Sequence, residues 1–536
     1  MDFNLGDLFE HAADTWPERE YLVANGQRRT YAEMEARANR MAHHLAAHGV
    51  RAGDHVGIYG LNSVEWVETL WAVFKLRATW VNINYRYVED ELAYLFENAD
   101  LVALVYEEAF GPRVVGVRER LPLLRHSVVI GDGSSAEAAA LGSVPYEEAL
   151  AGASPSRDFA PRSADDRYIL FTGGTTGLPK GVVWRHGDVI MALGGGIDMR
   201  TGERVRTPAD FVAKGLAGGP LVSYPIAPLM HGATQWGVMG GSFTGNKIVL
   251  SARFDAAAVW SLVGAEGVNL LIITGDAMAR PLIEELSRPG ASYDLSTLFA
   301  VSSTAARFSQ ALKDELLERL PHLVVTDAIG SSETGGTGLT MVAKGVSMKG
   351  GPTVTPIADA VVLDESLKPL PAGSGVVGRV ARGGNIPLGY YKDDAKTAET
   401  FVLAADGKRY ALAGDFGLVE ADGSITLLGR GSVSINSGGE KIFPEEVEAA
   451  VVAHPEVYDA IVVGLPDPRW GERVTAVVQP RPGLAPSLES IQDHCRTRIA
   501  GYKLPRYLVL VDRVERSPSG KPDYPWAAAV ARDSLS

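Results

Sequence analysis

The feature that most constrains the fold is the alternation of helical patterns with short apolar strands over residues from about 5 to 130. Apolar side chains recur at helical spacing in 31–48, and 55–59 follows as an apolar strand. A second helical pattern covers 65–74, and 101–106 is again strand-like. Because strand–helix–strand crossovers make strands parallel and place helices over the faces, this order predicts a mostly parallel sheet covered on both sides.

The chain of 536 residues is too long for one hydrophobic core, so two or more domains are expected. The strand pattern resumes at 269–274 and 323–329. From about residue 352 short β segments with Gly and Pro turns, such as 360–363 and 378–383, predict a small barrel-like or sandwich region. Residues 134–161, rich in Ala, Ser and Gly, read as a looser link.

The pattern changes again after residue 429. A helix is predicted to begin at Pro444 and to run to about residue 453, strands follow near 460–464 and 474–479, and a helix follows near 488–499. We therefore predict an α/β fold with a large N-terminal domain, 1–429, which includes the small barrel-like β region. A small mobile α+β domain, 430–536, completes the chain.

Composition narrows the class of function. The net charge of −14 is spread along the chain, which argues against a nucleic-acid partner because binding a phosphate backbone needs a basic face. Cys495 is the single cysteine, so neither an internal disulfide nor a cysteine-based metal site is expected. No signal peptide and no apolar run of membrane-spanning length are visible, and we expect a cytoplasmic protein. The oligomeric state is not readable.

The segment 172–181, TGGTTGLPKG, is the strongest functional signal. It combines four glycines, three threonines and one lysine directly after the strand-like 168–171. Free backbone amides, hydroxyl donors and an ammonium group together suit a polyphosphate. The spacing rejects a P-loop NTPase, because Gly177 is followed by Leu-Pro and Lys180 by glycine. A mobile surface loop is the alternative, but it would need no fixed proline or lysine.

Weaker signals follow along the chain. Glu333 lies just after the strand 323–329, where open α/β sheets bind ligands, and a carboxylate is a hard oxygen ligand for Mg²⁺. Asp415 could accept hydrogen bonds from ribose hydroxyls, and Arg430 could supply a charge nearby. Lys521 stands in the turn-prone segment 516–521. Each of these residues is individually as consistent with a solvated loop as with a site.

Their order along the chain resembles the adenylate-forming superfamily of acyl-CoA synthetases, luciferases and peptide-synthetase adenylation domains. The resemblance spans nearly the whole chain and rests on seven segments in order: 172–181, APLMHG at 227–232, the Glu333 segment, Gly414-Asp415, Gly429-Arg430, GGEK at 438–441, and Ser519-Gly520-Lys521. Three further segments, VWRH at 183–186, GDAMA at 275–279 and SGGEK at 437–441, look closest to actinobacterial acyl-CoA synthetases.

The resemblance implies that a carboxylate attacks the α-phosphorus of ATP, giving an acyl-adenylate and pyrophosphate, after which the small domain rotates and a thiol, usually of CoA, displaces AMP. By the resemblance, the residues at the nucleotide are Thr172, Gly173, Gly174, Thr175, Thr176, Gly177, Lys180, Ser303, Thr304, Ala305, Ala328, Gly330, Ser331, Ser332, Asp415, Arg430 and Lys521. The catalytic set is Thr172, His231, Glu333, Arg430 and Lys521, with Glu333 on Mg²⁺ and Lys521 bridging the acyl carboxylate and the ribose. The acyl group would meet His231, Gly232 and Gly330, and CoA would meet Gly438, Gly439 and Lys441.

The sequence departs from the family pattern at several positions. Gly173 replaces a usual serine, Ser303-Thr304 replace a usual Gly-Gly, and Ser332 replaces a common threonine. Val433 stands where the family generally has Asp or Lys at the hinge of the small domain, and a valine is stiffer and makes no polar contact. It is either a tolerated hinge variant or a sign that thioester formation is slow or left to another protein.

The identity of the acid is least constrained. The segments 189–196 and 220–245 are expected to line the acyl pocket, where glycines either leave volume for a bulky apolar acid or serve tight backbone packing. The resemblance favours steroid-side-chain, terpenoid or fatty acids over acetate or amino acids. The enzymatic alternative is an acyl-AMP ligase that passes the adenylate to a carrier protein or second enzyme. A catalytically silent nucleotide-binding protein is disfavoured by the retention of Glu333 and Lys521.

Overall fold

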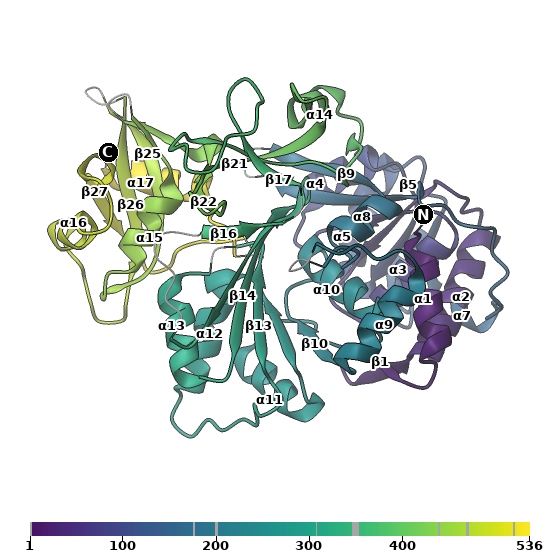
Figure 1. The fold of residues 1–536 in the computed structure, drawn as a ribbon. Coiled ribbons are helices and arrows are strands. Elements are labelled where there is room, and N and C mark those ends of the chain that lie inside the picture. The colour runs from purple at the N-terminus through teal and green to yellow at the C-terminus, as the bar shows by residue number, and fades with distance from the viewer. Residues whose placement is uncertain are drawn as a thin grey trace.

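The structure is a computed structural model. It describes residues 3–174, 177–198, 202–306, 308–345, 353–357, 359–437, 440–467, 471–517 and 520–535. Three sheets organise the chain, two in the N-terminal part and one in the C-terminal part, which lies at the opposite edge of the molecule from the N-terminus (Figure 1). Among the described residues, no helix is long and apolar enough to cross a membrane.

The first sheet has eight strands in the order β19-β9-β8-β4-β3-β5-β6-β7. The strands from β8 to β7 in this order are parallel, as the sequence predicted, whereas β9 and β19 are antiparallel additions at one edge. Their bounds are β3 His55–Tyr59, β4 Thr79–Asn82, β5 Leu101–Glu107, β6 His126–Ile130, β7 Val144–Pro145, β8 Arg167–Gly174, β9 Gly177–Arg185 and β19 Gly389–Tyr390.

The second sheet has fourteen strands and changes character along its length. A parallel part, β1-β11-β10-β12-β13-β14, continues into antiparallel strands, in the part of the chain where the sequence predicted a barrel-like or sandwich region. The bounds are β1 Glu20–Ala24, β2 Gln27–Thr30, β10 Val222–Pro225, β11 Lys247–Leu250, β12 Leu270–Ile273, β13 Ala300–Thr304, β14 Val324–Ser331, β15 Gly335–Ala343, β16 Thr353–Pro356, β17 Ala360–Leu363, β18 Gly378–Arg382, β20 Phe401–Leu403, β21 Arg409–Val419 and β22 Ile425–Arg430.

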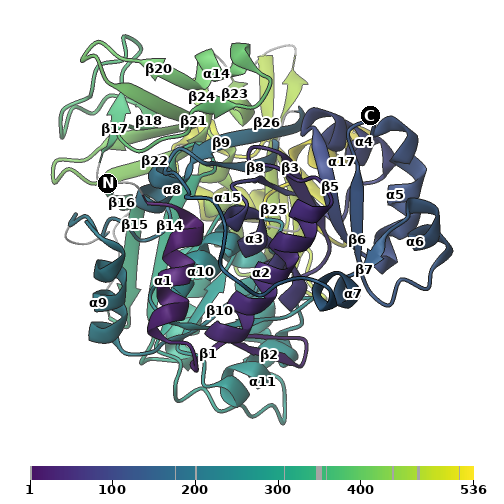
Figure 2. The ribbon, with the colours of Figure 1, turned by 90° about the vertical axis from the view of Figure 1, so that its right-hand side faces the viewer.

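Helices cover these sheets, and α1, α2 and α3 lie side by side (Figure 2). The N-terminus of α2 is fixed by a capping box in which Thr30 and Glu33 each bond the other's backbone amide. The bounds are α1 Leu5–Thr15, α2 Tyr31–Ala47, α3 Val64–Lys75, α4 Glu89–Asn98, α5 Gly111–Val117, α6 Ala136–Leu141, α7 Tyr146–Ala151, α8 His186–Ala192, α9 Pro208–Gly218, α10 Gly232–Phe243, α11 Ala256–Glu266, α12 Gly275–Leu286, α13 Gln310–Arg319 and α14 Asp394–Thr400, with short 3₁₀ turns at Glu108–Phe110 and Arg118–Arg120.

The C-terminal part is a small α+β unit around a five-stranded sheet. Its core is formed by apolar side chains of α15, α16 and the two long strands β25 and β26. The bounds are β23 Ile435–Ser437, β24 Glu440–Ile442, α15 Pro444–Val452, β25 Val457–Asp467, β26 Gly471–Pro480, α16 Leu488–Arg496, β27 Tyr507–Leu510 and α17 Tyr524–Leu535, with 3₁₀ turns at Gly431–Val433 and Gly501–Lys503.

The fold class predicted from the sequence is confirmed, with two local corrections. Residues 134–161 are not a loose link throughout, because α6, β7 and α7 occupy half of them. Ala-rich stretches are good helix formers once they can pack. The phosphate segment is the end of a β-hairpin rather than a free loop, since β8 and β9 pair antiparallel up to Gly174 and Gly177. The division at residue 429 stays a prediction.

Candidate active site

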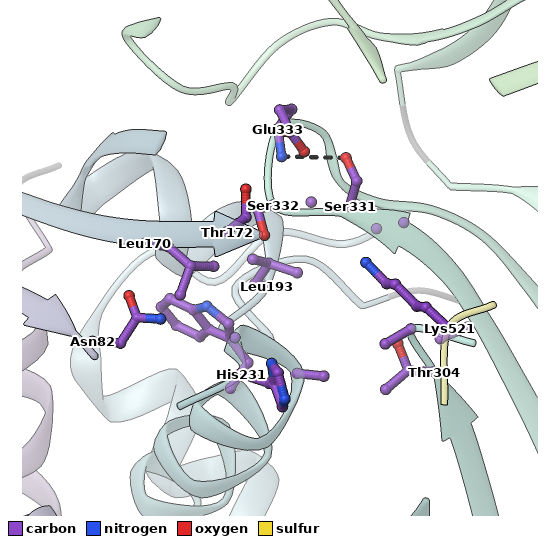
Figure 3. A pocket seen from close by; sticks show the side chains of 18 of the residues that line it. Asn82, Leu170, Thr172, Leu193, His231, Thr304, Ser331, Ser332, Glu333 and Lys521 are labelled. Carbon is purple, nitrogen blue, oxygen red and sulfur yellow. Dashed lines mark hydrogen bonds between the residues drawn. The ribbon is translucent and has the colours of Figure 1, made fainter. Parts of the chain in front are cut away.

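One cavity of about 800 Å³ collects eleven of the predicted site residues (Figure 3). Its wall is built from the ends of β8 and β14, the start of α10 and the C-terminal segment that carries Lys521. The predicted residues that line it are Thr172, His231, Gly232, Thr304, Ala305, Ala328, Gly330, Ser331, Ser332, Glu333 and Lys521. Segments up to several hundred positions apart in the sequence therefore meet at one place.

The phosphate hairpin is held at its base by Asn82, the last residue of β4. The Asn82 side chain donates to the carbonyl oxygens of Phe171 and Met230, at 2.9 and 2.7 Å, and accepts from the Phe171 amide at 2.8 Å. The hairpin register places Thr172 directly opposite Lys180. Asn82 thereby fixes the hairpin relative to the segment that precedes His231. Thr175 and Thr176 lie outside the described residues.

Lys180 is held by an acidic partner that the sequence did not reveal. Its ammonium forms an ion pair with Asp393, the N-cap of α14, and both side chains are about one-third exposed. This interaction, followed by the Lys396 amide, lowers the pKa of Asp393. A polyphosphate that binds Lys180 must therefore compete with a carboxylate already in place.

Glu333 lies in the turn between β14 and β15, and the turn is fixed from three sides. The Glu333 amide donates to Ser331 Oγ at 3.2 Å, and the Trp184 indole donates to the Ser332 carbonyl at 2.9 Å. The Tyr390 hydroxyl donates to Glu333 Oε1 at 2.9 Å. The carboxylate is therefore oriented before any ligand arrives, on the same side of the cavity as Thr172 (Figure 3).

A buried arginine supports the same turn from beneath. Arg382 is 1 % exposed, lines the cavity, and donates from Nη1 to the carbonyl oxygens of Thr334 and Gly336. Burial lowers the pKa of Arg382 to about 10. Gly335 between these carbonyls has φ +67°, and a Cβ there would lie 3.0 Å from Arg382 Nη1, so a glycine is required.

His231 lies at the N-cap of α10, lines the cavity and is half-buried. Its Nε2 atom has no hydrogen-bond partner among the described residues. Burial, followed by the positive charges of Lys521 and Arg86, lowers the pKa of His231 to about 4. The imidazole is therefore neutral at pH 7, and Lys521 lies near enough to act on it electrostatically (Figure 3).

The turn that carries Lys521 is held in place by hydrogen bonds of Arg516 and by close packing at Gly520. Arg516 forms an ion pair with Asp459 at 2.7 Å and donates to the Gly520 carbonyl at 3.2 Å. Gly520 has φ +75°, and a Cβ there would lie 3.0 Å from Ala277 Cβ and 3.1 Å from the Thr274 carbonyl. Gly520 thus allows the C-terminal unit to approach the start of α12 closely enough for the lysine to enter the cavity.

Several predicted residues lie away from the cavity wall. The β21–β22 register places Asp415 directly opposite Arg430, of which only the backbone is described, and Asp415 does not line the cavity. Ser303 is fully buried and accepts from the Gly275 amide at 3.1 Å, so its side chain serves the start of α12. Gly438 and Gly439 lie outside the described residues, and of Lys441 only the backbone strand is described.

The remaining wall of the cavity is largely apolar, as expected for an acyl pocket. Its side chains from α8, α10 and the neighbouring segments are Met191, Ala192, Leu193, Ile197, Trp236, Ile272 and Ile357. Gly195 and Gly237 also line it, whereas Cβ atoms on Gly194 and Gly196 would meet the Ile190 carbonyl at 3.0 and 2.9 Å. A Cβ on Gly195 would meet nothing within 4 Å, whereas a Cβ on Gly237 would lie 3.2 Å from Ile272 Cδ1. Open volume therefore occurs at Gly195, and tight packing occurs at the other three positions.

Sequence reasoning missed Asn82, Arg382, Tyr390 and Asp393. None of them stands in a recognisable motif, and their partners are 46 to 213 positions away in the sequence. The only available signal was the polar run Lys392-Asp393-Asp394, which directly follows Gly389-Tyr390-Tyr391. These residues position the groups that face the cavity.

Comparison with solved structures agrees with this fold. The anthranilate CoA ligase AuaEII in complex with anthranoyl-AMP superposes with a TM-score of 0.85 at 23% identity, over 100% of this chain and 98% of that one. A Mycobacterium tuberculosis fatty acyl CoA synthetase superposes with a TM-score of 0.72 at 24% identity, over 99% of both chains. At these identities the likeness concerns the fold.

Comparison with sequences is more specific. A 3-oxocholest-4-en-26-oate–CoA ligase of Rhodococcus rhodochrous is 52% identical over 98% of this chain and 96% of its own. A medium/long-chain-fatty-acid–CoA/3-oxocholest-4-en-26-oate–CoA ligase of Mycobacterium tuberculosis is 51% identical over 98% and 95%. The family model of AMP-binding enzymes matches residues 9–391, and that of the AMP-binding enzyme C-terminal domain matches residues 446–521. The chain is therefore a member of the AMP-binding enzyme family, and it is an acid–thiol ligase.

Proposed function

We propose that the protein activates a bulky apolar carboxylic acid, of the steroid-side-chain or medium- to long-chain fatty type, and transfers it to CoA. The observation that carries the proposal is a single cavity in which an apolar wall meets Thr172, Glu333 and Lys521. The relatives named above, ligases of such acids at 51–52% identity, support the choice of substrate. A terpenoid acid has the same apolar character and stands as an alternative.

In the first half-reaction a carboxylate oxygen of the acid attacks the α-phosphorus of ATP, and the bond to the bridging oxygen of pyrophosphate breaks. Negative charge grows on the phosphoryl oxygens during this step, and positioned cations stabilise it without forming bonds. Lys521 enters the cavity from the C-terminal unit and is placed to serve both the acid and the nucleotide. Lys180 binds the phosphates once they replace Asp393 as its ion-pair partner.

The residues present also fit a hard divalent cation. Glu333 offers an oriented carboxylate and Thr172 a hydroxyl on the same side of the cavity, which are oxygen donors of the kind Mg²⁺ prefers. Mg²⁺ held there would supply charge neutralisation on the phosphates. Tyr390 acts through Glu333 by fixing the direction of its carboxylate.

His231 contributes a neutral, unpaired imidazole at the junction of the two halves of the cavity. The neutral ring would orient the substrate carboxylate beside the charge of Lys521. Asp415 and Arg430 would reach the ribose at the edge of the site.

In the second half-reaction the sulfur of CoA attacks the acyl carbon, AMP departs with the electron pair of the acyl–phosphate bond, and the thiol proton is released. Lys521 cannot remain in the cavity for this step if the family's rotation of the small domain applies here. Gly438, Gly439 and Lys441 are then the residues proposed to meet CoA.

The substrate is tested by incubating the protein with ATP, Mg²⁺, CoA and one acid at a time, and by measuring AMP and acyl-CoA separately by mass spectrometry. The expected result is thioester formation with 3-oxocholest-4-en-26-oate and with medium- and long-chain fatty acids, and little with acetate or amino acids. Equal turnover of acetate, or no AMP with any apolar acid, would contradict the proposal.

Val433 favours one alternative, an enzyme that makes acyl-AMP but completes the thioester slowly or with a partner protein. It lies in the 3₁₀ turn Gly431–Val433, directly after β22, and its side chain is half-buried. The test compares the native protein with Val433→Asp in both half-reactions. If the alternative holds, the native protein accumulates acyl-AMP and the variant converts it to acyl-CoA faster. Rapid acyl-CoA formation by the native protein alone would exclude it.

A further inference from the structure

A cluster of three histidines lies outside the cavity, between α2 and β6. His44 belongs to the last turn of α2, His48 caps this helix, and His126 is the first residue of β6. One imidazole nitrogen of each can be chosen so that all three lie within 4.8 Å of one another. Helix α2 runs along the edge of the molecule opposite the C-terminal unit, so the cluster is remote from that unit (Figure 1).

The imidazole rings of His44 and His126 each point a nitrogen atom at the other. His44 Nε2 and His126 Nε2 are 2.8 Å apart, and both side chains are 9 % exposed. Burial lowers the pKa of His44 to about 4 and that of His126 to about 3, so both rings are neutral at pH 7. A single proton therefore lies between the two Nε2 atoms, and both of these atoms are capable of binding a metal.

The third ring is oriented by the helix backbone. His48 Nδ1 lies 2.8 Å from the His44 carbonyl oxygen, and because a carbonyl only accepts, Nδ1 carries the proton. The tautomer therefore leaves the lone pair on Nε2. A hydrogen bond from Nδ1–H to a backbone carbonyl is the usual support of a metal-binding histidine. His44 and His48 also have the i, i+4 spacing that places two ligands on one helix face.

We propose that His44, His48 and His126 form a binding site for a divalent transition-metal ion of the zinc class, which joins the end of α2 to β6. Imidazole nitrogen suits zinc, copper and nickel, and three histidine ligands leave a fourth position for water. Metal–nitrogen bonds of about 2.0–2.1 Å in a tetrahedron separate the nitrogens by about 3.3 Å. His44 and His126 therefore move apart slightly, and the exposed His48 turns from its stack on His126, where the ring centroids are 4.0 Å apart.

A packed cluster without affinity for metal is the competing explanation, since the three rings also stack on one another. The two explanations predict different numbers of metal ions bound per chain and different effects of replacing His48. A packing role predicts that the exposed His48 is dispensable. A metal site predicts that His48 affects ion binding although it contributes little to the core.

The test uses the full-length, tag-free protein, freed of metal by a chelator and dialysed against Zn²⁺ alone. The expected result is about one tightly held equivalent of Zn²⁺ per chain. His126→Gln is expected to weaken binding by more than about 10-fold, and His48→Gln by about 10-fold. His43→Gln is the matched control, because His43 is on the same helix but pairs with Asp158. Substitution with Co²⁺ should give the absorption bands of a tetrahedral nitrogen site.

Far-ultraviolet circular dichroism and ATP–pyrophosphate exchange show whether each variant is folded. His48→Gln keeps the test decisive if His126→Gln does not fold, because the side chain it replaces is exposed. The proposal is overturned if the native protein retains no Zn²⁺, or if His48→Gln and His43→Gln bind it equally well. Neither result would affect the proposed acid-activating reaction, which depends on a different part of the molecule.

Discussion

The hydrogen bond from Tyr390 to Glu333 allows a quantitative test of the proposal that Glu333 binds Mg²⁺. Tyr390→Phe removes the hydroxyl that donates to Glu333 Oε1 at 2.9 Å and leaves the ring in place. A hydrogen bond to a charged group contributes about 1.5–3 kcal/mol when it is buried. Because Glu333 is only half-buried, we expect a loss of about 1–2 kcal/mol, which is a factor of about 5–30 in an equilibrium constant.

The assay is ATP–pyrophosphate exchange as a function of Mg²⁺ concentration. The expected result is that Tyr390→Phe needs about 5–30 times more Mg²⁺ for half-maximal exchange, with little change in the rate at saturation. Tyr391→Phe is the matched control, because the Tyr391 hydroxyl donates to Asp100 at 2.7 Å, away from Glu333. The reasoning is refuted if Tyr390→Phe shows the native Mg²⁺ dependence, or if both variants lose equally.

Three further predictions follow from the structure. Asp393→Asn removes the carboxylate that competes with ATP for Lys180. Because this ion pair is about one-third exposed, KM for ATP should fall by about 1.4- to 5-fold in the exchange assay. A rise in KM would contradict the competition. Gly520→Ala forces a φ of +75° on alanine at a cost of about 1–2 kcal/mol and should slow adenylation about 5- to 30-fold, while thioester formation from supplied acyl-AMP stays near native. His186 and His231 have folded-state pKa values of about 4, below the 6.5 of an unfolded histidine, so their neutral forms contribute fully above pH 6.5. The free energy of unfolding should therefore fall as pH drops from 6.5 towards 4, by up to about 1.4 kcal/mol per pH unit for each histidine, and a stability that is flat between pH 7 and 5 would count against this.

The sequence predicted those parts of the fold that local pattern determines. The apolar periodicity of 31–48 predicted a helix, and the structure places α2 at Tyr31–Ala47, with a capping box at its start that this prediction did not use. The strand before the phosphate segment was likewise expected. Its hairpin partner was not, because β9 begins within the glycine-rich segment, where side chains carry no alternating pattern.

The residues of the site also divide into those that the sequence could predict and those that it could not. Residues that face the cavity, such as Glu333 and Lys521, stand in motifs that resemble a known family and could be predicted. Residues that position them could not. Tyr390 is 57 positions from Glu333 and Asp393 is 213 positions from Lys180, and only the tertiary fold brings these pairs together. The depressed pKa of His231 is equally a product of burial and of a lysine 290 positions away.

The central claim is that Lys521 and the cavity it enters activate an apolar acid with ATP. The most direct measurement is ATP–pyrophosphate exchange with 3-oxocholest-4-en-26-oate and a long-chain fatty acid, for the native protein and for Lys521→Ala. We predict exchange that depends on the acid and that falls by about 100-fold or more in the variant, because one preorganised charge is lost. Exchange that needs no acid, or that survives Lys521→Ala unchanged, would contradict the account.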